Sequence, residues 1–555
     1  MALACTYSVA LVGVEGHVVR IEADIEDGLV GLLLVGLPDT ALREARDRIR
    51  SAIVNSREAW PYRRITVGLS PASLPKRGSS FDLGIAVAIM AAAGAAPVDF
   101  LDRAVFLGEL GLDGRLHPVR GVLPGVAAAA AAGFREVMVP RANAAEAALV
   151  PGMRVISAPS LSAALGWIRG DPAAFGPDAA EEFDRSRQPP AADRHPTADR
   201  HPTADRHPTA DRHPTADRHP TADRHLPQTD GRTDGLDLAD VLGQPLARRA
   251  AEICAAGGHH LMLLGPPGTG KTMLAERIPT ILPPLDLAEA LEVMSIHSVA
   301  GLLPPDTPLI SEPPFCGPHH TSTKAAIVGG GGGSGMIRPG AASLAHNGIL
   351  LLDEAPEFDR DVLDALRQPL ESGQVVIARA ALTARFPARF TLVLAANPCP
   401  CARASGAKGA CVCTPVVRRR YLGRLSGPLL DRVDVKVEFL PVSRAELLSD
   451  GKSAEPSAVV AARVAEARQR TAHRLAGTSW RLNAQVPGGE LRRRFPPAPG
   501  ALKPLEHAID LGEISARGVD RVLRVSWTLA DLAGKSRPDA EETCYALGLW
   551  LGVGS

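Results

Sequence analysis

The sequence has no net charge, because 61 Lys and Arg residues balance 61 Asp and Glu residues along 555 positions. The overall charge therefore indicates neither a nucleic-acid nor a membrane partner, and any basic surface has to be local. Long apolar runs are also absent: the longest, residues 83–98, is short and rich in Ala and Gly. It is typical of a buried helix rather than a membrane span.

The features of a secreted chain are missing as well. Residues 1–25 contain no basic n-region and alternate as strands do, so we expect no signal peptide. Only eight cysteines are present, and four of them crowd between positions 399 and 413. This spacing differs from the disulfide framework of a small secreted domain. We therefore expect a cytoplasmic protein with no membrane partner.

With 45% hydrophobic and 22% charged residues, the composition is that of a globular protein, and the length predicts about three domains. The hexapeptide DRHPTA occurs five times from residue 193 and begins again at 223. Because a proline in every copy prevents helix and sheet, we predict a disordered linker at 171–235. Its histidines leave metal binding open as an alternative. The predicted folded units are 1–170, 236–441 and 442–555.

The first unit alternates strand-like and helical patterns, which predicts a mixed α/β domain. Its strands are expected at 18–25, 29–35, 64–69 and 136–140, and its helices at 40–55, 81–93 and 122–132. In the second unit, helices separate the apolar segments HLMLLG, GILLLDE and RFTLVLAAN, which predicts a parallel sheet covered on both faces. The last unit is expected to be helical, with its clearest helix at 515–534.

A phosphate-binding loop follows the segment HLMLLG. The pattern GxxxxGK[ST], placed between a strand and a helix, lets backbone N–H groups surround the phosphates of ATP. Lys271 is expected to contact the β- and γ-phosphates, and the Thr272 hydroxyl to bind Mg²⁺. The loop consists of Gly265, Pro266, Pro267, Gly268, Thr269, Gly270, Lys271 and Thr272.

Polar side chains at the ends of the other two apolar strands predict the rest of an ATPase site. Asp353 is expected to join the Mg²⁺ shell, and Glu354 to polarise the attacking water. Paired acids also occur at solvated strand ends, but a pair that follows a phosphate loop indicates catalysis. Asn397 ends the third strand, where its side chain is expected to orient the same water.

Five long segments carry a family resemblance: PHHTSTKAAIVGGG, RPGAASLAHNGILLLDEAPEF, LDALRQPLESGQVVIARA, FPARFTLVLAANPCPC and YLGRLSGPLLDRVD. They resemble the magnesium-chelatase-like AAA+ proteins of the ComM/YifB type, over nearly the whole chain outside the linker. The resemblance implies a Lon-protease-like N-terminal domain, an AAA+ core and a helical C-terminal lid. It also implies a homo-oligomer, a hexameric ring that acts on single-stranded or branched DNA in recombination of incoming strands. Cys316 stands where such proteins usually carry arginine.

In such rings an arginine of the neighbouring subunit stabilises charge on the transferring phosphate. The resemblance assigns this role to Arg432, and the alternative is a surface ion pair with Asp431 or Asp434.

The lid carries three arginines on one helical stripe, at 517, 521 and 524. The resemblance favours Arg517 or Arg524 as the residue that senses the γ-phosphate. The alternative for the whole stripe is a basic face in contact with solvent.

The N-terminal unit resembles the peptidase domain of Lon in the segments GLPDTALREARDRIRSAI, ITVGLSPASLPKRGSSFDL and PVRGVLPGVAAAAAAGFREVMVP. Ser80 matches the nucleophile, which needs a base to take its proton. The position of the lysine base holds Leu123, and Lys76 lies on the serine's own loop without matching that base. We therefore expect no peptidase activity, and a role in oligomerisation or substrate guidance.

Two Cys-x-Cys pairs follow the third strand, at Cys399, Cys401, Cys411 and Cys413. Four thiolates this close predict a tetrahedral Zn²⁺ site. Free thiols and a redox disulfide are the alternatives.

Two basic segments are candidates for contact with nucleic acid. Lys324 and Arg338 flank five glycines at 329–333, where the resemblance places a pore-facing hairpin, and an ordinary surface loop is the alternative. The other segment is a patch beside Tyr421 that is equally suited to phosphates or to a subunit interface. It consists of Arg418, Arg419, Arg420 and Arg424.

Three functions fit these patterns: a DNA-acting AAA+ motor, a motor subunit for metal insertion into a tetrapyrrole, and an ATP-dependent peptidase. The Lon-like unit and the segment NPCPC favour the first, because chelatase motors usually begin at the AAA+ core. Leu123 argues against the third.

Overall fold

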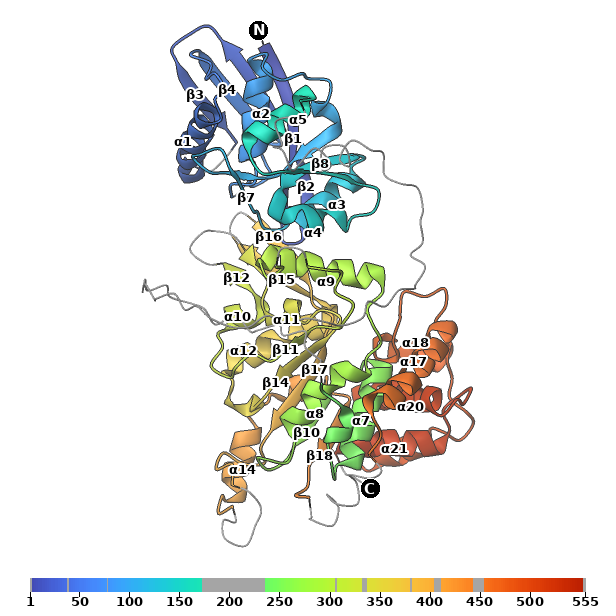
Figure 1. The fold of residues 1–555 in the computed structure, drawn as a ribbon. Helices are drawn as coiled ribbons and strands as arrows, with labels where there is room; N and C mark the ends of the chain where they lie inside the picture. The colour runs from blue at the N-terminus through green and yellow to red at the C-terminus, as the bar shows by residue number, and fades with distance from the viewer. Residues whose placement is uncertain are drawn as a thin grey trace, which may run out of the picture.

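The computed structural model describes residues 2–36, 39–76, 78–171, 235–304, 307–331, 337–379, 382–403, 411–442 and 454–552. The predicted linker at 171–235 therefore lies outside the described residues except at its two ends, as does the tip of the glycine-rich hairpin. Figure 1 shows the N-terminal domain in blue and cyan above the green-to-orange core, with the C-terminal helices in red beside that core. Among the described helices, none is long and apolar enough to cross a membrane.

A seven-stranded sheet in the order β3-β4-β2-β1-β5-β8-β9 forms the N-terminal domain. The long strands β1 (Ala2–Val12) and β2 (Glu15–Glu26) pair antiparallel, and β4 (Arg64–Ser70) joins β2 in the same way. The outer strands run parallel to their neighbours: β3 (Gly31–Val35), β5 (Ala104–Phe106), β8 (Glu136–Pro140) and β9 (Arg154–Ala158). The strands predicted at 18–25, 29–35, 64–69 and 136–140 are confirmed as β2, β3, β4 and β8.

Helices cover both faces of this sheet, because successive side chains of a strand point to opposite sides. Ala104 and Phe106 pack into one apolar cluster, and Val105 between them packs into another. The first cluster takes side chains from α1 (Asp39–Asn55), α2 (Asp82–Ala92) and α5 (Leu161–Arg169). The second takes them from α3 (Val122–Ala131) and α4 (Ala144–Ala148). The predicted mixed α/β class is confirmed.

Five parallel strands in the order β11-β14-β17-β10-β18 form the core sheet. Their bounds are β11 (Phe315–Cys316), β14 (Ile349–Leu352), β17 (Thr391–Ala396), β10 (Leu261–Leu264) and β18 (Val435–Glu438). Ile349 and Leu351 pack on one face of the sheet, and Leu350 and Leu352 on the other. Both faces are therefore buried, as the uninterrupted apolar segments predict.

Helices α7 (Pro245–Gly257) and α8 (Lys271–Arg277) cover one face of the core sheet. The other face is covered by α9 (Leu287–Ala300), α11 (Ala341–Leu344) and α12 (Arg360–Ala365), and α13 (Arg367–Ser372) follows α12. Two hairpins project from this unit, β12 (Gly330–Gly331) with β13 (Ile337–Arg338), and β15 (Gln374–Arg379) with β16 (Leu382–Pro387). The smaller helices are α10 (Lys324–Val328), α14 (Pro415–Leu422) and α15 (Gly427–Leu430).

The C-terminal helices pack on the core face that carries α7. They are α17 (Ser457–Arg474), α18 (Gly488–Arg493), α19 (Lys503–Asp510), α20 (Ala516–Leu532) and α21 (Ala540–Leu551). Fully buried Asp434 accepts a hydrogen bond from Arg521 of α20 at 2.9 Å. Burial alone would raise the pKa of Asp434, but the Arg521 guanidinium holds it well below its usual range. This ion pair ties the helical unit to the sheet.

The N-terminal domain rests on α9 of the core through its helix α3. Met294 of α9 belongs to the same apolar cluster as Leu123 of α3. The Ser298 hydroxyl donates a hydrogen bond to the Glu146 carboxylate, and the Gly121 N–H donates to the Ser298 carbonyl at 3.2 Å. The two domains therefore share both apolar and polar contacts.

Candidate nucleotide site

The loop after β10 exposes backbone where a phosphate group would have to approach. Gly265 passes so close to the chain after β18 that a Cβ atom would lie 2.6 Å from the Cβ of Phe439. Gly268 and Gly270 have φ values of +77° and +94°, with open space beside both. The loop then enters α8 at Lys271. Free backbone N–H groups at such a helix start favour anions.

Lys271 is buried at the centre of this loop. Its ammonium group donates to the carbonyl oxygens of Gly265 and Pro266 at 2.7 and 2.8 Å, and to Asn397 Oδ1 at 3.2 Å. Burial lowers the pKa of Lys271, although the two carboxylates at the end of β14 oppose this shift. The contact with Asn397 joins the ends of the neighbouring strands β10 and β17.

Thr272, in the first turn of α8, contacts Asp353 at the end of β14. The Thr272 hydroxyl donates to Asp353 Oδ2 at 2.7 Å, and the backbone N–H of Glu354 donates to Asp353 Oδ1 at 2.8 Å. Hydroxyl and carboxylate oxygens are the protein ligands that Mg²⁺ takes beside phosphates. The pair therefore fits an Mg²⁺ site at the position that the sequence predicts.

Glu354 has a contact that the strand pattern does not predict. Its backbone is left-handed, with φ 51°, and its Oε2 lies 3.1 Å from Nδ1 of His320. His320 comes from the loop before α10, and its ring lies 4.1 Å from that of His319. The paired histidines in the segment PHHTST are the only sequence signal for this contact.

Arg432 lies between α15 and β18. It donates to Glu371 Oε2 at 2.7 Å and to the Pro428 carbonyl at 2.6 Å. The hydrogen bond from Arg432 and the positive charge of its guanidinium both lower the pKa of Glu371. The acidic partner is therefore Glu371, and neither Asp431 nor Asp434, which the sequence offered as the alternatives.

The three arginines of α20 have different surroundings. Arg521 is bound to Asp434, and Arg524 donates to the Val486 carbonyl at 2.7 Å within the helical unit. Arg517 is exposed and makes no hydrogen bond or ion pair with any described residue. Of the two candidates from the sequence, Arg517 is thus the one whose guanidinium is available to a ligand.

Neither candidate base from the sequence reaches Ser80, and Arg120 is the described basic residue that lines the same pocket. Leu123 is 1% exposed within the apolar cluster of α3, and its backbone N–H donates to Glu146 Oε1 at 2.9 Å. The buried Lys76 ammonium donates to two backbone carbonyls of its own loop, at 2.5 and 3.0 Å. Neither side chain is placed to take a proton from Ser80.

The two basic segments differ in the partners of their cations. Lys324 is exposed at the start of α10, and Arg338 lies on β13 with a buried Nε that has no hydrogen-bond partner among the described residues. On α14, Arg418, Arg419 and Arg420 are exposed. Arg424 instead donates to Glu357 and to the Pro356 carbonyl, each at 3.0 Å.

Three family models match this chain. One described as magnesium chelatase, subunit ChlI, matches residues 237–447, and one described as subunit ChlI of Mg-chelatase matches residues 21–143. A third, the C-terminal part of magnesium chelatase subunit ChlI, matches residues 454–549. The Magnesium-chelatase 38 kDa subunit of Cereibacter sphaeroides is 26% identical, over 28% of this chain and 51% of its own length.

Other relatives match along the whole chain. An uncharacterised protein of Mycobacterium tuberculosis is 48% identical, over 99% of this chain and 98% of its own length. Competence protein ComM of Haemophilus influenzae is 38% identical, over 99% of this chain and 97% of its own. The protein named YifB in Escherichia coli is 38% identical, over 96% and 94%. From these full-length matches, the chain belongs to the ComM/YifB family of magnesium-chelatase-like AAA+ proteins.

Proposed function

We propose that the protein hydrolyses ATP and uses the energy to move DNA strands. The observation that carries the ATPase part is the meeting of three parallel strand ends around one glycine loop. Lys271 bonds to Asn397, and Thr272 bonds to Asp353. This arrangement puts a cation, an Mg²⁺ ligand pair and a polar amide beside the backbone that would hold the phosphates.

Each side chain then has a distinct task. Lys271 would turn from the loop carbonyls to the β- and γ-phosphates. Thr272 and Asp353 would hold Mg²⁺, which neutralises developing charge on the phosphate oxygens when bound. Glu354 would accept the proton of the attacking water, and Asn397 would orient that water.

The proposed assembly is a homo-oligomeric ring, a hexamer by family resemblance, in the cytoplasm. In a ring, Arg432 would reach the phosphates bound by a neighbouring subunit once it leaves Glu371. Arg517 is the better candidate for the lid residue that senses the γ-phosphate, because Arg524 is already bound within the lid.

DNA is the proposed substrate. One full-length relative is named as a competence protein. Helix α10 and the β12–β13 hairpin offer Lys324 and Arg338, respectively, as cations without a partner among the described residues. Contacts from such residues would go to phosphates and would depend on salt rather than on sequence. Insertion of Mg²⁺ into a tetrapyrrole is the second candidate, supported by the chelatase descriptions of the family models. The chelatase relatives, however, align with under a third of the chain.

Steady-state ATPase assays with and without single-stranded and branched DNA test this proposal. Lys271→Ala should abolish turnover, and Glu354→Gln should bind ATP without hydrolysing it. The double variant Lys324→Ala, Arg338→Ala should keep the basal rate and lose most of the stimulation by DNA. A control variant, Arg419→Ala, removes one exposed arginine of α14. If DNA stimulation survives in the Lys324→Ala, Arg338→Ala variant but falls in Arg419→Ala, the DNA path lies along α14. If no DNA stimulates the ATPase of the wild type, the DNA-acting role is contradicted.

A further inference from the structure

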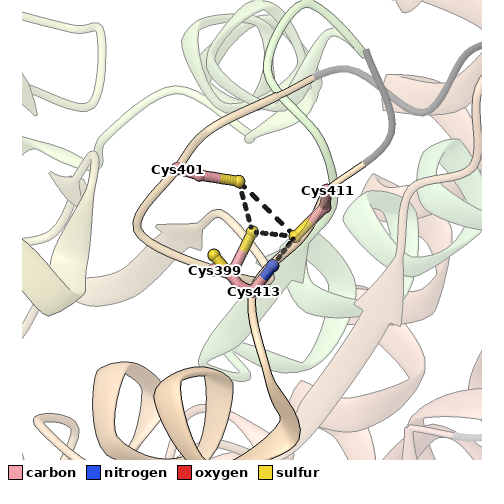
Figure 2. Close-up of side chains that lie close together, drawn as sticks. All are labelled: Cys399, Cys401, Cys411 and Cys413. Atoms are coloured by element: carbon pink, nitrogen blue, oxygen red, sulfur yellow. Dashed lines mark hydrogen bonds between the residues drawn. The ribbon is translucent and has the colours of Figure 1, made fainter.

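Four cysteine side chains converge in the loop that follows β17. Figure 2 shows the sulfur atoms of Cys399, Cys401 and Cys411 joined in a triangle, with sides of 3.2, 3.2 and 3.4 Å. Together with Cys413, all four Sγ atoms lie within 4.8 Å of one another. A disulfide would need about 2.05 Å between two sulfurs, so the four residues are separate thiols.

This spacing is that of ligands to a single ion. Zn–S bonds of about 2.3 Å in a tetrahedron place neighbouring sulfur atoms about 3.8 Å apart. The observed separations, 3.2 to 3.4 Å for three pairs, need only small rotations of the side chains to reach that value. An iron–sulfur cluster needs wider spacing, because its four thiolates are divided among two or four iron atoms.

Neighbouring donors favour thiolates at this point. The backbone N–H of Cys413 donates to Cys411 Sγ at 3.4 Å, and Arg418 Nη2 donates to the same sulfur at 3.6 Å. N–H groups and positive charge around coordinating sulfur are what stabilise an anionic tetrathiolate centre. Arg418 is thereby placed beside the cysteine group, although it belongs to the basic patch of α14.

The position of the group in the chain explains what a metal ion would do. Cys399 comes two residues after Asn397 of the nucleotide site, and Cys413 directly precedes Thr414, the N-cap of α14. Helix α14 has little core of its own: Tyr421 is its only buried residue, and Val416 is 65% exposed. A helix this short gains its stability from contacts with its surroundings, and few are available here.

We propose that Cys399, Cys401, Cys411 and Cys413 bind one structural Zn²⁺ ion, and that this ion fixes α14 to the end of β17. The site is closed, with four protein ligands and no open position, so its role is structural rather than catalytic. Binding at this site supplies the stability that α14 lacks. The basic patch is in this way held at a set distance from Asn397, whatever ligand the patch takes.

Metal analysis of the full-length protein purified without chelators tests the site. About one zinc per chain is expected in the wild type, and less than a tenth of that in Cys401→Ser. Cys544→Ser should keep all of it, because Cys544 is an exposed cysteine outside the group. Replacement by Co²⁺ should give the visible absorption of tetrahedral thiolate cobalt. Iron instead of zinc, two disulfides by mass spectrometry, or a metal-free protein that takes up neither Zn²⁺ nor Co²⁺ would overturn the proposal.

Hydrogen exchange tests the role of the ion without using activity. Removing zinc with a thiol reagent and chelator, or through Cys401→Ser, should speed exchange in α14 at least tenfold and leave α7 unchanged. Equal exchange in α14 with and without zinc would overturn the positioning role. Because neither readout uses ATP or DNA, failure here is distinguishable from failure of the proposed function.

Discussion

Nδ1 of His320 lies 3.1 Å from Oε2 of Glu354, the carboxylate proposed to activate water. The two residues come from different parts of the core, one from the loop before α10 and the other from the end of β14. Because α10 leads directly into the β12–β13 hairpin, His320 links the Glu354 carboxylate to the segment proposed to contact DNA.

His320→Ala should lower kcat for ATP about tenfold, because a free carboxylate spends less time in the orientation that activates water. KM for ATP should change less than threefold, since His320 does not touch the phosphate loop. His319→Ala is the matched control, because His319 bonds to Thr321 rather than to Glu354. Equal losses in both variants would contradict a specific role for His320.

Arg432→Ala should reduce kcat at least a hundredfold and leave ATP binding nearly intact, because the guanidinium acts only on the transition-state charge of a neighbouring site. Mixing this variant with Glu354→Gln should restore part of the activity, since each subunit then supplies what the other lacks. Glu371→Gln, which only frees Arg432, should stay within a few-fold of the wild type. Mixed rings that recover no activity would exclude action between subunits.

The phosphate loop was predictable because its residues are adjacent in sequence. Parallel strands bring their carboxyl ends to one edge, so the proximity of Asp353 and Asn397 to the loop followed from the apolar segments. The partners of Arg432 and Glu354 were not predictable, because Glu371 and His320 reach them from distant segments. Short strands such as β11, with two residues, carry too little alternation to be recognised. The roles of all these side chains remain predictions.

The stability of the core should fall as the pH drops from about 6.5 to 4, through protonation of His260. Burial lowers the pKa of His260 to about 4, and the charges of Arg521 and His259 add to this shift while Asp434 opposes it. The unfolded value is about 6.5. Stability from the neutral ring is therefore complete above pH 6.5 and is lost as the pH falls toward 4, on the order of 3 kcal/mol.

The variant His260→Asn removes the titration of His260 and leaves the other titratable groups of the chain in place. The Leu392 N–H donates to His260 Nδ1 at 3.0 Å, and an asparagine oxygen can accept the same hydrogen bond without titrating. Thermal unfolding between pH 7.5 and 4.5 should show a shallower loss of Tm in the variant than in the wild type. Parallel curves would show that His260 does not control acid stability.

Ser80→Ala should change neither ATP turnover nor any cleavage of casein or model peptides, both staying within twofold of the wild type. A serine hydroxyl is a weak nucleophile unless a base removes its proton, and neither Leu123 nor Lys76 is placed to remove it. Peptide hydrolysis that disappears in Ser80→Ala would show that a base reaches the site by another route.

Leu123→Lys places the missing base at its matching position, and it should destabilise the N-terminal domain rather than create a peptidase. Leu123 is 1% exposed and shares a cluster with Met294 of the core, so a lysine there would place a charge inside an apolar cluster. The expected cost is about 3 kcal/mol or more, measured as a lower Tm and faster hydrogen exchange in α9. Ala127→Lys introduces the same charge on the exposed side of α3 and should cost less than about 0.5 kcal/mol.

A stable Leu123→Lys protein that cleaves peptides through Ser80 would mean that only the lysine had been lost from a peptidase. Loss of stability without cleavage would mean that this surface of α3 has become the contact between the two domains.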